Sequence, residues 1–299
     1  MKKLYLLLIS VVILAGAFYF FWLTPKYTVP ILMYHNIGYD KNSFFVTPDN
    51  FARQMEYIKR HGYEVISLDE LARSIKEKRM LKRNKVVITF DDGYKDNFEY
   101  AYPVLRKFGY PATIFLITNF IDRSSIRALK RFLNWDEAMA LSKGKISFGG
   151  RTYIFRINDL AITEEKKFLS WDEVIIMHKG GISFGGHTKT HFDLGVIEDE
   201  EAALEEIEGS KKAIEDRIGA PADYFCYPGG GFNERAKQML IQAGYKGACT
   251  TNRGFAKFNS DVYELKRIKV TNSDMNKPFS FWAKLSGYYT IFKRERNPY

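Results

Sequence analysis

Two adjacent carboxylates, Asp91 and Asp92, come directly after an apolar run of strand-forming residues in the stretch VVITFDDG (86–93). Further along the chain, the stretch HTKTH places His187 and His191 four residues apart, a spacing that puts both imidazoles on one side of a helical turn or short loop. One carboxylate and two imidazoles supply three protein ligands and leave a position for water, as in a hydrolytic zinc site. The second carboxylate is then free to act as a base.

Each of these motifs has an ordinary alternative. An Asp-Asp-Gly sequence is common in turns, and a His-x-x-x-His spacing is more often incidental than metal-binding. Two neighbouring carboxylates also resist joint ionisation, but a divalent cation bound to one of them removes that penalty. Because both motifs occur at the ends of apolar runs, their combination favours a metal site.

A glycine-rich turn forms a third motif, FCYPGGGFN (225–233). Such a turn exposes backbone N–H groups beside the start of a helix, where a developing oxyanion is stabilised. The alternative is a tight connection between a strand and a helix. The pattern by itself gives the two interpretations equal weight.

The elements that position these motifs alternate along the chain. Strand-like apolar runs are predicted at 30–35, 63–68, 86–90, 111–117, 182–186, 223–228, 246–251 and 265–270. Segments of helical period lie between them, at 48–60, 69–79, 96–108, 170–179, 199–217 and 233–243. This alternation is typical of βα units around a parallel sheet. Seven or eight such units predict an α/β fold, an irregular (β/α) barrel with its chemistry at the C-terminal ends of the strands.

The N-terminal residues form a separate segment. Residues 4–23 carry no charge, and a helix of that length matches a hydrocarbon core of about 30 Å. Lys2 and Lys3 precede this run, so the positive-inside rule places the rest of the chain outside the cytoplasm. The alternative is a cleaved signal peptide with its site in the small-residue stretch 15–17. We favour a single-pass transmembrane helix, because aromatic apolar residues continue beyond that site.

Three regions follow from this organisation: a membrane anchor or signal segment at 1–27, the barrel domain at 28–275 and a basic aromatic tail at 276–299. The net charge of +10 favours anionic lipid or an acidic wall polymer as a partner, since no nucleic-acid-binding motif is visible. The two cysteines, Cys226 and Cys249, are too few for a disulfide framework. Free buried thiols are favoured over one bridge between neighbouring strands.

One segment is duplicated at a spacing of 36 residues. The sequence at 132–152 matches the sequence at 168–188 at 13 of 21 positions. Arg151 and Phe155 stand in the first copy where His187 and His191 stand in the second. If those histidines are ligands, the first copy is a degenerate structural unit.

The motifs TFDDG, HTKTH, YPGGG and LKRIKV together resemble the polysaccharide deacetylases of carbohydrate esterase family 4, the NodB-homology domain. The opening VPILMYHNIG (29–38) is similar to the branch that acts on poly-N-acetylglucosamine. The resemblance covers roughly residues 28–272. It implies hydrolysis of N-acetyl groups with one divalent metal ion, for which zinc is favoured.

The resemblance also implies a role for individual residues. Asp91 would be the general base, and the metal would be held by Asp92, His187 and His191. A backbone N–H near Gly229 would share the oxyanion of the tetrahedral intermediate. Arg267 would orient Asp91 or contact the substrate.

Two departures from the family pattern affect this assignment. Cys226 stands near the place of an arginine that usually precedes the glycine turn, and the late histidine that protonates the leaving amine is missing, since no histidine follows His191. His35, at the end of the first strand, is a candidate for that proton donor, with a structural role as the alternative. Tyr94 and Tyr227 flank the predicted site and are candidates for contact with sugar.

The sequence therefore predicts a membrane-bound, metal-dependent N-deacetylase that acts on an extracytoplasmic N-acetylated polysaccharide of the poly-N-acetylglucosamine or peptidoglycan type. Its expected partners are that polysaccharide and membrane lipid. One alternative is a catalytically idle carbohydrate-binding or assembly protein on the same fold, which the missing late histidine permits. Another is a non-haem iron oxygenase, because two histidines and one carboxylate also describe that ligand set.

Overall fold

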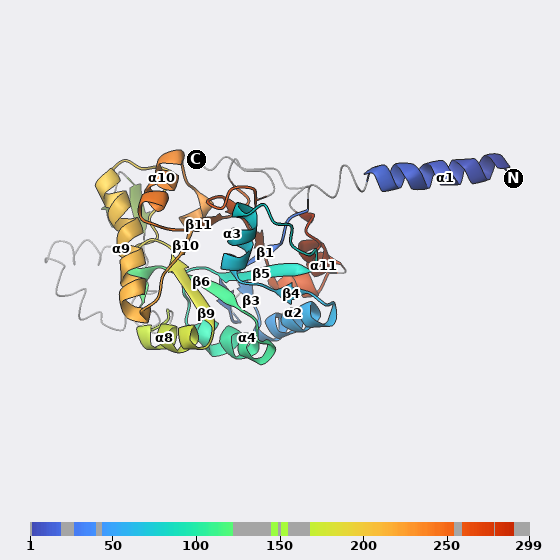
Figure 1. Cartoon of the computed structure of the whole chain (residues 1–299). Coiled ribbons are helices and arrows are strands. Elements are labelled where there is room, and N and C mark those ends of the chain that lie inside the picture. Colours follow the sequence, from blue (N-terminus) through green and yellow to red (C-terminus); the bar gives the residue numbers. More distant parts are fainter. Residues whose placement is uncertain are drawn as a thin grey trace, which may run out of the picture.

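The computed structural model describes residues 2–18, 27–39, 44–121, 145–148, 151–154, 168–253, 259–277 and 279–289. Its centre is a parallel sheet with strand order β12-β11-β10-β9-β6-β5-β1-β13, in which β4 also pairs with β5 (Figure 1). The strands are β1 (Ile31–Tyr34), β4 (Glu64–Val65), β5 (Lys85–Phe90), β6 (Ala112–Leu116), β9 (Ile182–Gly186), β10 (Tyr224–Cys226), β11 (Gly247–Thr250), β12 (Leu265–Lys266) and β13 (Ile268–Lys269).

The last two strands close the ring. Leu265 and Lys266 pair with β11, whereas Ile268 and Lys269 pair with β1, the first strand of the sheet. A single short segment therefore joins the two ends of the sheet, and Arg267 lies between its two halves. This nearly closed parallel sheet confirms the predicted barrel.

Helices cover the outside of the sheet (Figure 1). They are α2 (Pro48–Arg60), α3 (Leu68–Lys76), α4 (Tyr102–Phe108), α8 (Trp171–Lys179), α9 (Glu200–Ile218), α10 (Glu234–Gln242) and α11 (Ser280–Leu285). A π-helical turn, η3 (Asn97–Ala101), precedes α4, and 3-10 turns form η4 (Thr118–Phe120), η6 (Pro228–Gly230) and η8 (Asn272–Met275). The Thr47 and Ser170 side chains cap α2 and α8 by accepting hydrogen bonds from backbone N–H groups of their first turns.

Alternate residues of the strands enter two different hydrophobic clusters. Leu32 and Ile88 pack beneath the outer helices with the first cluster, whereas Ile31 and Val87 belong to the second cluster inside the barrel. Each fully buried aliphatic side chain of this kind stabilises the fold by roughly 1.5–3 kcal/mol. Since side chains alternate along a strand, Asp91 continues the inward-facing series of β5.

The two cysteines lie opposite each other inside the barrel. Cys226 of β10 and Cys249 of β11 are paired in register, and both are buried and free. The prediction of free buried thiols on neighbouring strands is confirmed.

Two predicted regions, the membrane span and the C-terminal tail, differ from the structure or lie partly outside it. α1 (Lys2–Ala17) has 16 residues, and within the described part of the chain no helix is long and apolar enough to cross a membrane. Residues 19–26 of the predicted span lie outside the described residues. The segment predicted as a tail contains α11, whose Phe281 and Leu285 are buried in the core, so the folded body extends past residue 275.

The duplicated segment adopts different backbone structures in its two copies. Residues 132–144 of the first copy lie outside the described residues. The part that is described forms an antiparallel pair, β7 (Lys145–Phe148) and β8 (Arg151–Ile154), which is separate from the barrel sheet. The equivalent part of the second copy forms β9, in the middle of the sheet. A further small parallel pair is β2 (Asn36–Ile37) with β3 (Phe45–Val46).

Candidate active site

The two aspartates lie where the chain leaves β5. Asp92 has a φ of 72° and Gly93 a φ of 75°, so the backbone turns sharply at these positions. A Cβ atom at Gly93 would lie only 2.7 Å from Cδ2 of Leu116, which explains the glycine after the acidic pair. Because of this turn the two carboxylates meet different partners.

The two histidines are held by a second turn of unusual backbone conformation after β9. Thr188 has a φ of 59° and His191 a φ of 66°, and the Phe192 N–H donates to the Thr188 hydroxyl across the turn at 2.9 Å. Non-glycine residues with positive φ are uncommon and cost on the order of 1–3 kcal/mol each, and they cluster at functional sites. Together with Asp92, three such residues occur within this one site.

Asp92 and the two histidines form a compact set of potential ligands. The Oδ1 atom of Asp92 lies 3.4 Å from Nε2 of His187 and 3.8 Å from Nε2 of His191. Ligand atoms about 2.0–2.1 Å from a tetrahedral zinc ion lie roughly 3.4 Å apart, so the spacing fits one ion with little adjustment. The donor set, one carboxylate and two imidazoles, also suits zinc or a similar divalent metal.

Surrounding groups orient these donors. The Nδ1 atom of His187 lies 2.7 Å from the carbonyl oxygen of Cys226, and a proton on Nδ1 would leave Nε2 free for a metal. The Tyr94 hydroxyl donates a hydrogen bond to the Asp92 carboxylate, and burial together with this carboxylate raises the pKa of Tyr94. Tyr94 therefore supports a ligand, and its ring stacks on Phe168 with 5.2 Å between centroids.

The ionisation states of Asp92 and the two histidines are compatible with metal binding. Burial alone would raise the pKa of Asp92, but its hydrogen bond and charge interaction with His187 lower it. Burial and the neighbouring His187 lower the pKa of His191 to about 4, so this imidazole is neutral near pH 7. Burial opposes the charged form of His187, whereas Cys226 and the Asp92 and Asp91 carboxylates raise its pKa.

Asp91 is bound by Arg267 instead of the histidines. The two Nη atoms of Arg267 donate to the two carboxylate oxygens, each at 2.6 Å, in the bidentate geometry that makes such pairs strong. Burial would raise the pKa of Asp91, but the guanidinium outweighs it and lowers that pKa. Asp91 is therefore ionised and able to accept a proton.

Arg267 is fixed by partners that the sequence did not suggest. Its guanidinium donates to the Thr89 hydroxyl at 3.1 Å, to the Thr250 carbonyl at 3.1 Å and to the Cys226 thiol at 3.0 Å. A polar threonine in the middle of the apolar run VVITF was the available indication for Thr89. Cys226 stands near the place of the family's arginine, and here its sulfur accepts a hydrogen bond from Arg267, which lies between β12 and β13.

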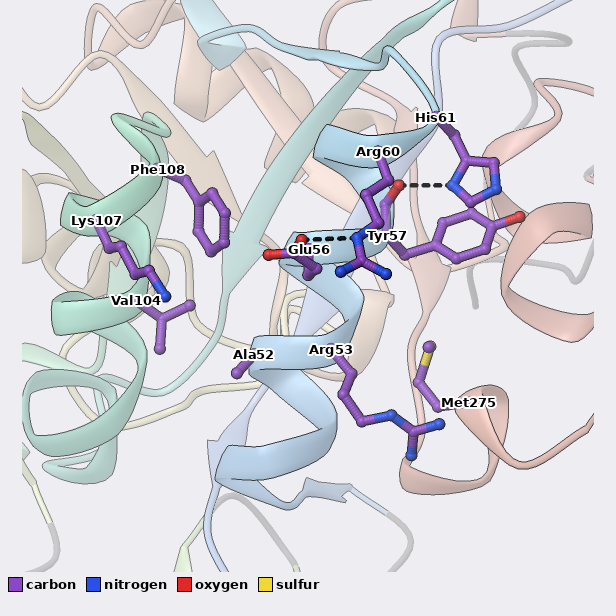
Figure 2. Close-up of a pocket in the computed structure, with 10 residues that line it drawn as sticks. All are labelled: Ala52, Arg53, Glu56, Tyr57, Arg60, His61, Val104, Lys107, Phe108 and Met275. Carbon is purple, nitrogen blue, oxygen red and sulfur yellow. Dashed lines mark hydrogen bonds and ion pairs between the residues drawn. The ribbon is translucent and has the colours of Figure 1, made fainter.

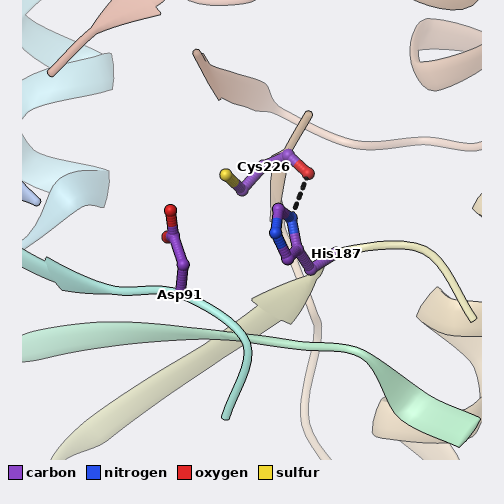
Figure 3. Close-up of side chains that lie close together, drawn as sticks. All are labelled: Asp91, His187 and Cys226. Atoms are coloured by element: carbon purple, nitrogen blue, oxygen red, sulfur yellow. Dashed lines mark hydrogen bonds between the residues drawn. The ribbon is translucent and has the colours of Figure 1, made fainter. Parts of the chain in front are cut away.

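Figure 3 shows a second group of potential ligands, Asp91, His187 and Cys226, in which all three side chains are buried. Both Asp91 oxygens are occupied by Arg267. Burial raises the pKa of Cys226, so its sulfur is a thiol and a poor ligand. This group therefore connects Asp91 to the cluster around Asp92, and Asp92 with the two histidines is the better candidate for a metal site.

His35 lies beside the base. Its Nε2 atom is 3.8 Å from Oδ2 of Asp91, and 18% of its side chain is exposed. Burial lowers the pKa of His35 against the opposing effect of Asp91. The structure thus brings the partly exposed His35 side chain next to Asp91, as expected for a candidate proton donor.

The two remaining candidates come from the turn after β10. Gly229 is exposed, with a φ of 62°, in the turn η6. Tyr227 is different, because only 1% of it is exposed and its ring stacks on Phe232, with 4.5 Å between centroids, in a hydrophobic cluster. The predicted contact of Tyr227 with sugar is therefore not supported, since its side chain points into the core.

A carboxylate held by an arginine, next to a cluster of one aspartate and two histidines at the C-terminal ends of barrel strands, is the arrangement of a hydrolytic site on a (β/α) barrel. The chain belongs to the polysaccharide deacetylase family, whose family model matches residues 78–248. It is therefore a hydrolase of that family, as the motifs predicted.

Individual relatives agree with this assignment. The Bacillus subtilis (strain 168) protein YxkH is 28% identical over 243 residues, which cover 81% of this chain and 71% of that protein. A poly-beta-1,6-N-acetyl-D-glucosamine N-deacetylase of Staphylococcus epidermidis is 36% identical over 87 residues, which cover 29% of this chain and 30% of that enzyme.

Solved structures share the fold. The Streptococcus pyogenes deacetylase PplD has a TM-score of 0.66 at 24% identity, over 86% of this chain and 98% of PplD. IcaB from Ammonifex degensii has a TM-score of 0.62 at 19% identity, over 88% of this chain and 97% of IcaB.

Proposed function

We propose that this protein hydrolyses N-acetyl groups of a poly-N-acetylglucosamine or peptidoglycan type of polysaccharide outside the cytoplasm, with one divalent metal ion, zinc in the first instance. The observation that carries the proposal is the division of work between the adjacent aspartates: Asp92 faces two histidines, and Asp91 faces an arginine. The similarity to poly-beta-1,6-N-acetyl-D-glucosamine N-deacetylases supports the choice of substrate.

The residues of the chain have distinct tasks in this reaction. Asp92, His187 and His191 would hold the ion, which when bound lowers the pKa of a water molecule and polarises the acetamide carbonyl. Asp91, kept ionised by Arg267, accepts the proton of the attacking water. A backbone N–H in the exposed turn around Gly229 donates to the oxyanion.

His35 completes the proton transfer. The leaving amine needs a proton, and the Nε2 atom of His35 lies 3.8 Å from the carboxylate that has just accepted one. His35 therefore passes a proton from Asp91 to the amine, in place of the histidine that the chain lacks after position 191.

The location of the enzyme is part of the proposal. Tyr5, Leu8, Val12 and Leu14 of α1 are all exposed, Lys2 and Lys3 precede them, and the uncharged sequence runs on to residue 23, as in an N-terminal anchor. We expect the full-length chain to stay with membranes at its full mass. A mature form that begins near Phe18 would establish a cleaved signal peptide instead.

The test is the release of acetate from N-acetylglucosamine oligomers by the purified full-length protein, together with elemental analysis of its metal. We expect release by the wild type and its loss in His187→Gln along with the metal. His178→Gln, which changes a histidine of α8 outside the site, should keep both. A wild-type protein that holds metal but releases no acetate would favour the idle carbohydrate-binding alternative.

A further inference from the structure

The turn between the two histidines of the candidate metal site has an unusual backbone conformation. Thr188 and His191 have positive φ angles, which cost free energy and persist only where the surroundings hold them. The Thr118 N–H of η4 donates to the Thr188 carbonyl at 3.3 Å. The next N–H of η4, from Asn119, donates to the Lys189 carbonyl at 2.9 Å. Carbonyl groups of the turn are therefore bound by the segment that follows β6.

The N–H groups of the same turn are bound by Glu206 of α9. One oxygen of its carboxylate accepts the Lys189 N–H at 2.7 Å and the Thr190 N–H at 2.9 Å. The other oxygen accepts the Thr190 hydroxyl at 2.7 Å. Hydrogen bonds to an ionised acceptor are about twice as strong as those between neutral groups. This one carboxylate is therefore a strong support of the turn.

Both sets of hydrogen bonds act on the same two peptide groups, 188–189 and 189–190. In a trans peptide the carbonyl and the N–H point in opposite directions, and the described part of the chain has no cis bond. η4 binds the carbonyl end of each of these peptide groups, and Glu206 binds the N–H end. The orientation of both peptide groups is thereby fixed, and so is the direction in which the chain continues to His191.

The two histidines depend on this turn to different degrees. The His187 N–H donates to the Leu116 carbonyl at 3.0 Å, and its Nδ1 atom lies 2.7 Å from the Cys226 carbonyl oxygen. Neighbouring strands therefore hold His187 directly. The His191 ring has no hydrogen-bond partner among the described residues, and 43% of its side chain is exposed. The position of His191 is thus set mainly by the backbone of the turn.

Two other glutamates on the outer helices bind side chains instead of backbone groups. Figure 2 shows Glu56 of α2 with Arg60, four residues along the same helix, and 2.7 Å separates the arginine Nε from the carboxylate. Glu205, next to Glu206 on α9, pairs with the Lys189 ammonium. Exposed pairs of this kind contribute little to stability, because water solvates both charges. Glu206 differs from both in binding the backbone that leads to a candidate ligand.

We propose that Glu206 is a positioning residue of the metal site, which holds the turn after β9 in the conformation that presents His191 to the ion. This rests on the proposed function, in which His191 is a metal ligand. Groups that orient the ligands of a metal site raise the affinity of that site for its ion. Glu206 does so through two peptide groups instead of through the imidazole itself.

The test measures the zinc dissociation constant of the full-length protein by titration against a chelator of known affinity. In Glu206→Ala we expect this constant to rise about 10–100-fold, because the turn loses the acceptor that orients it. Glu206→Gln keeps an oxygen that accepts both N–H groups, so it should recover most of the affinity. Glu205→Ala is the matched control on α9, and it should bind zinc as the wild type does.

Hydrogen exchange of the metal-free proteins gives a second measurement. The Lys189 and Thr190 amides should exchange faster in Glu206→Ala than in the wild type, and Glu205→Ala should leave their exchange unchanged. Urea unfolding of the same variants gives the unfolded fraction, for which the zinc titration is corrected.

Wild-type affinity for zinc in Glu206→Ala would overturn the proposal. So would a loss of affinity that disappears after correction for the unfolded fraction, or an equal loss in Glu205→Ala. An equal loss in Glu206→Gln would also overturn it, since the charge of residue 206 and not its hydrogen bonds to the turn would then matter to the ion.

Failure of the proposed function gives a different result. A protein whose zinc affinity depends on Glu206 but which releases no acetate from oligomers supports the positioning role and refutes only the deacetylase activity. A wild-type protein that binds no zinc refutes the metal site, and the role of Glu206 with it.

Discussion

Two buried ion pairs in this protein have similar chemistry but different surroundings. Asp274 and Lys284 lie 10 residues apart, and the carboxylate also accepts from Thr271 and Ser280, all within one short segment. Asp91 and Arg267 lie 176 residues apart. The Asp274–Lys284 pair holds a local turn together, whereas the Asp91–Arg267 pair joins two segments that are far apart in the sequence.

The histidines sharpen this contrast. Asp91 has His35 3.8 Å away and lies beside the ligand set of Asp92. The partners of Asp274 are the Thr271 capping box that starts η8, the Ser280 hydroxyl and the Lys284 ammonium. We therefore expect that damage to the first pair is seen mainly in the rate, and damage to the second mainly in stability.

The largest expected effect is the loss of deacetylation rate in the Asp91→Asn variant. This change removes the base but leaves the ligand set intact, so deacetylation should fall by roughly 10²–10⁴-fold while the metal remains. Metal content and acetate release are measured together. Asp92→Asn is the matched variant and should lose metal as well as activity. Equal loss of metal in the two variants would mean that both carboxylates are ligands.

The next effect is on stability. Asp274→Asn leaves the Lys284 ammonium buried without its counter-ion, so the free energy of unfolding should fall by about 3–5 kcal/mol. Urea unfolding measures this, and the folded fraction should keep its deacetylation rate. Asp216→Asn, which breaks an exposed pair with Lys212 on α9, should change little. A loss of rate per folded molecule in Asp274→Asn would remove the distinction between the two pairs.

A smaller effect is expected on the free energy of unfolding at acidic pH. Lys284 lowers the pKa of Asp274, and Arg267 lowers the pKa of Asp91, each against the effect of burial. A carboxyl whose pKa is lower in the folded state stabilises the protein fully above its unfolded value, about 3.9, and this stabilisation is lost as pH falls through the folded pKa. Unfolding free energy should therefore decline below about pH 4. The decline should be shallower in Asp274→Asn; an unchanged slope would contradict this.

The smallest effect is expected at Cys226. Cys226→Ser keeps an acceptor for Arg267, so the free energy of unfolding should change by about 0.5–1.5 kcal/mol, with a modest effect on rate. Among the described residues Cys249 accepts no hydrogen bond from Arg267, so Cys249→Ser buries a less well paired hydroxyl and should lose more stability. Thermal unfolding of both variants makes the comparison, and the reverse order would show that the Arg267 contact with sulfur is unimportant.

The sequence predicted the elements better than their long-range partners. α2 was predicted at 48–60 and is observed at the same residues, because its amphipathic period and its cap are local properties. The ligand set was also predictable, since the two motifs are short and each follows a strand. The ion pair between Arg267 and Asp91 forms only because the barrel closes. No local sequence pattern predicts that closure.

Tyr94 and Tyr227 show the same limit of prediction from the sequence. Tyr94 and Tyr227 look alike in sequence, each close to a motif, yet one supports Asp92 and the other is buried in a hydrophobic cluster. Which face of a turn a side chain takes depends on backbone angles such as those at Asp92 and Gly229. A sequence pattern gives the order of the residues but not these angles.

The position of Arg267 in the segment that closes the barrel has a consequence for folding during synthesis of the chain. During synthesis Asp91 leaves the ribosome long before Arg267. The Asp91 carboxylate, which is buried in the folded protein, therefore has no cationic partner at that stage. A partly made barrel therefore lacks both its last strand and the charge that its base requires. We therefore expect a chain that ends before Arg267 to be inactive as well as unstable.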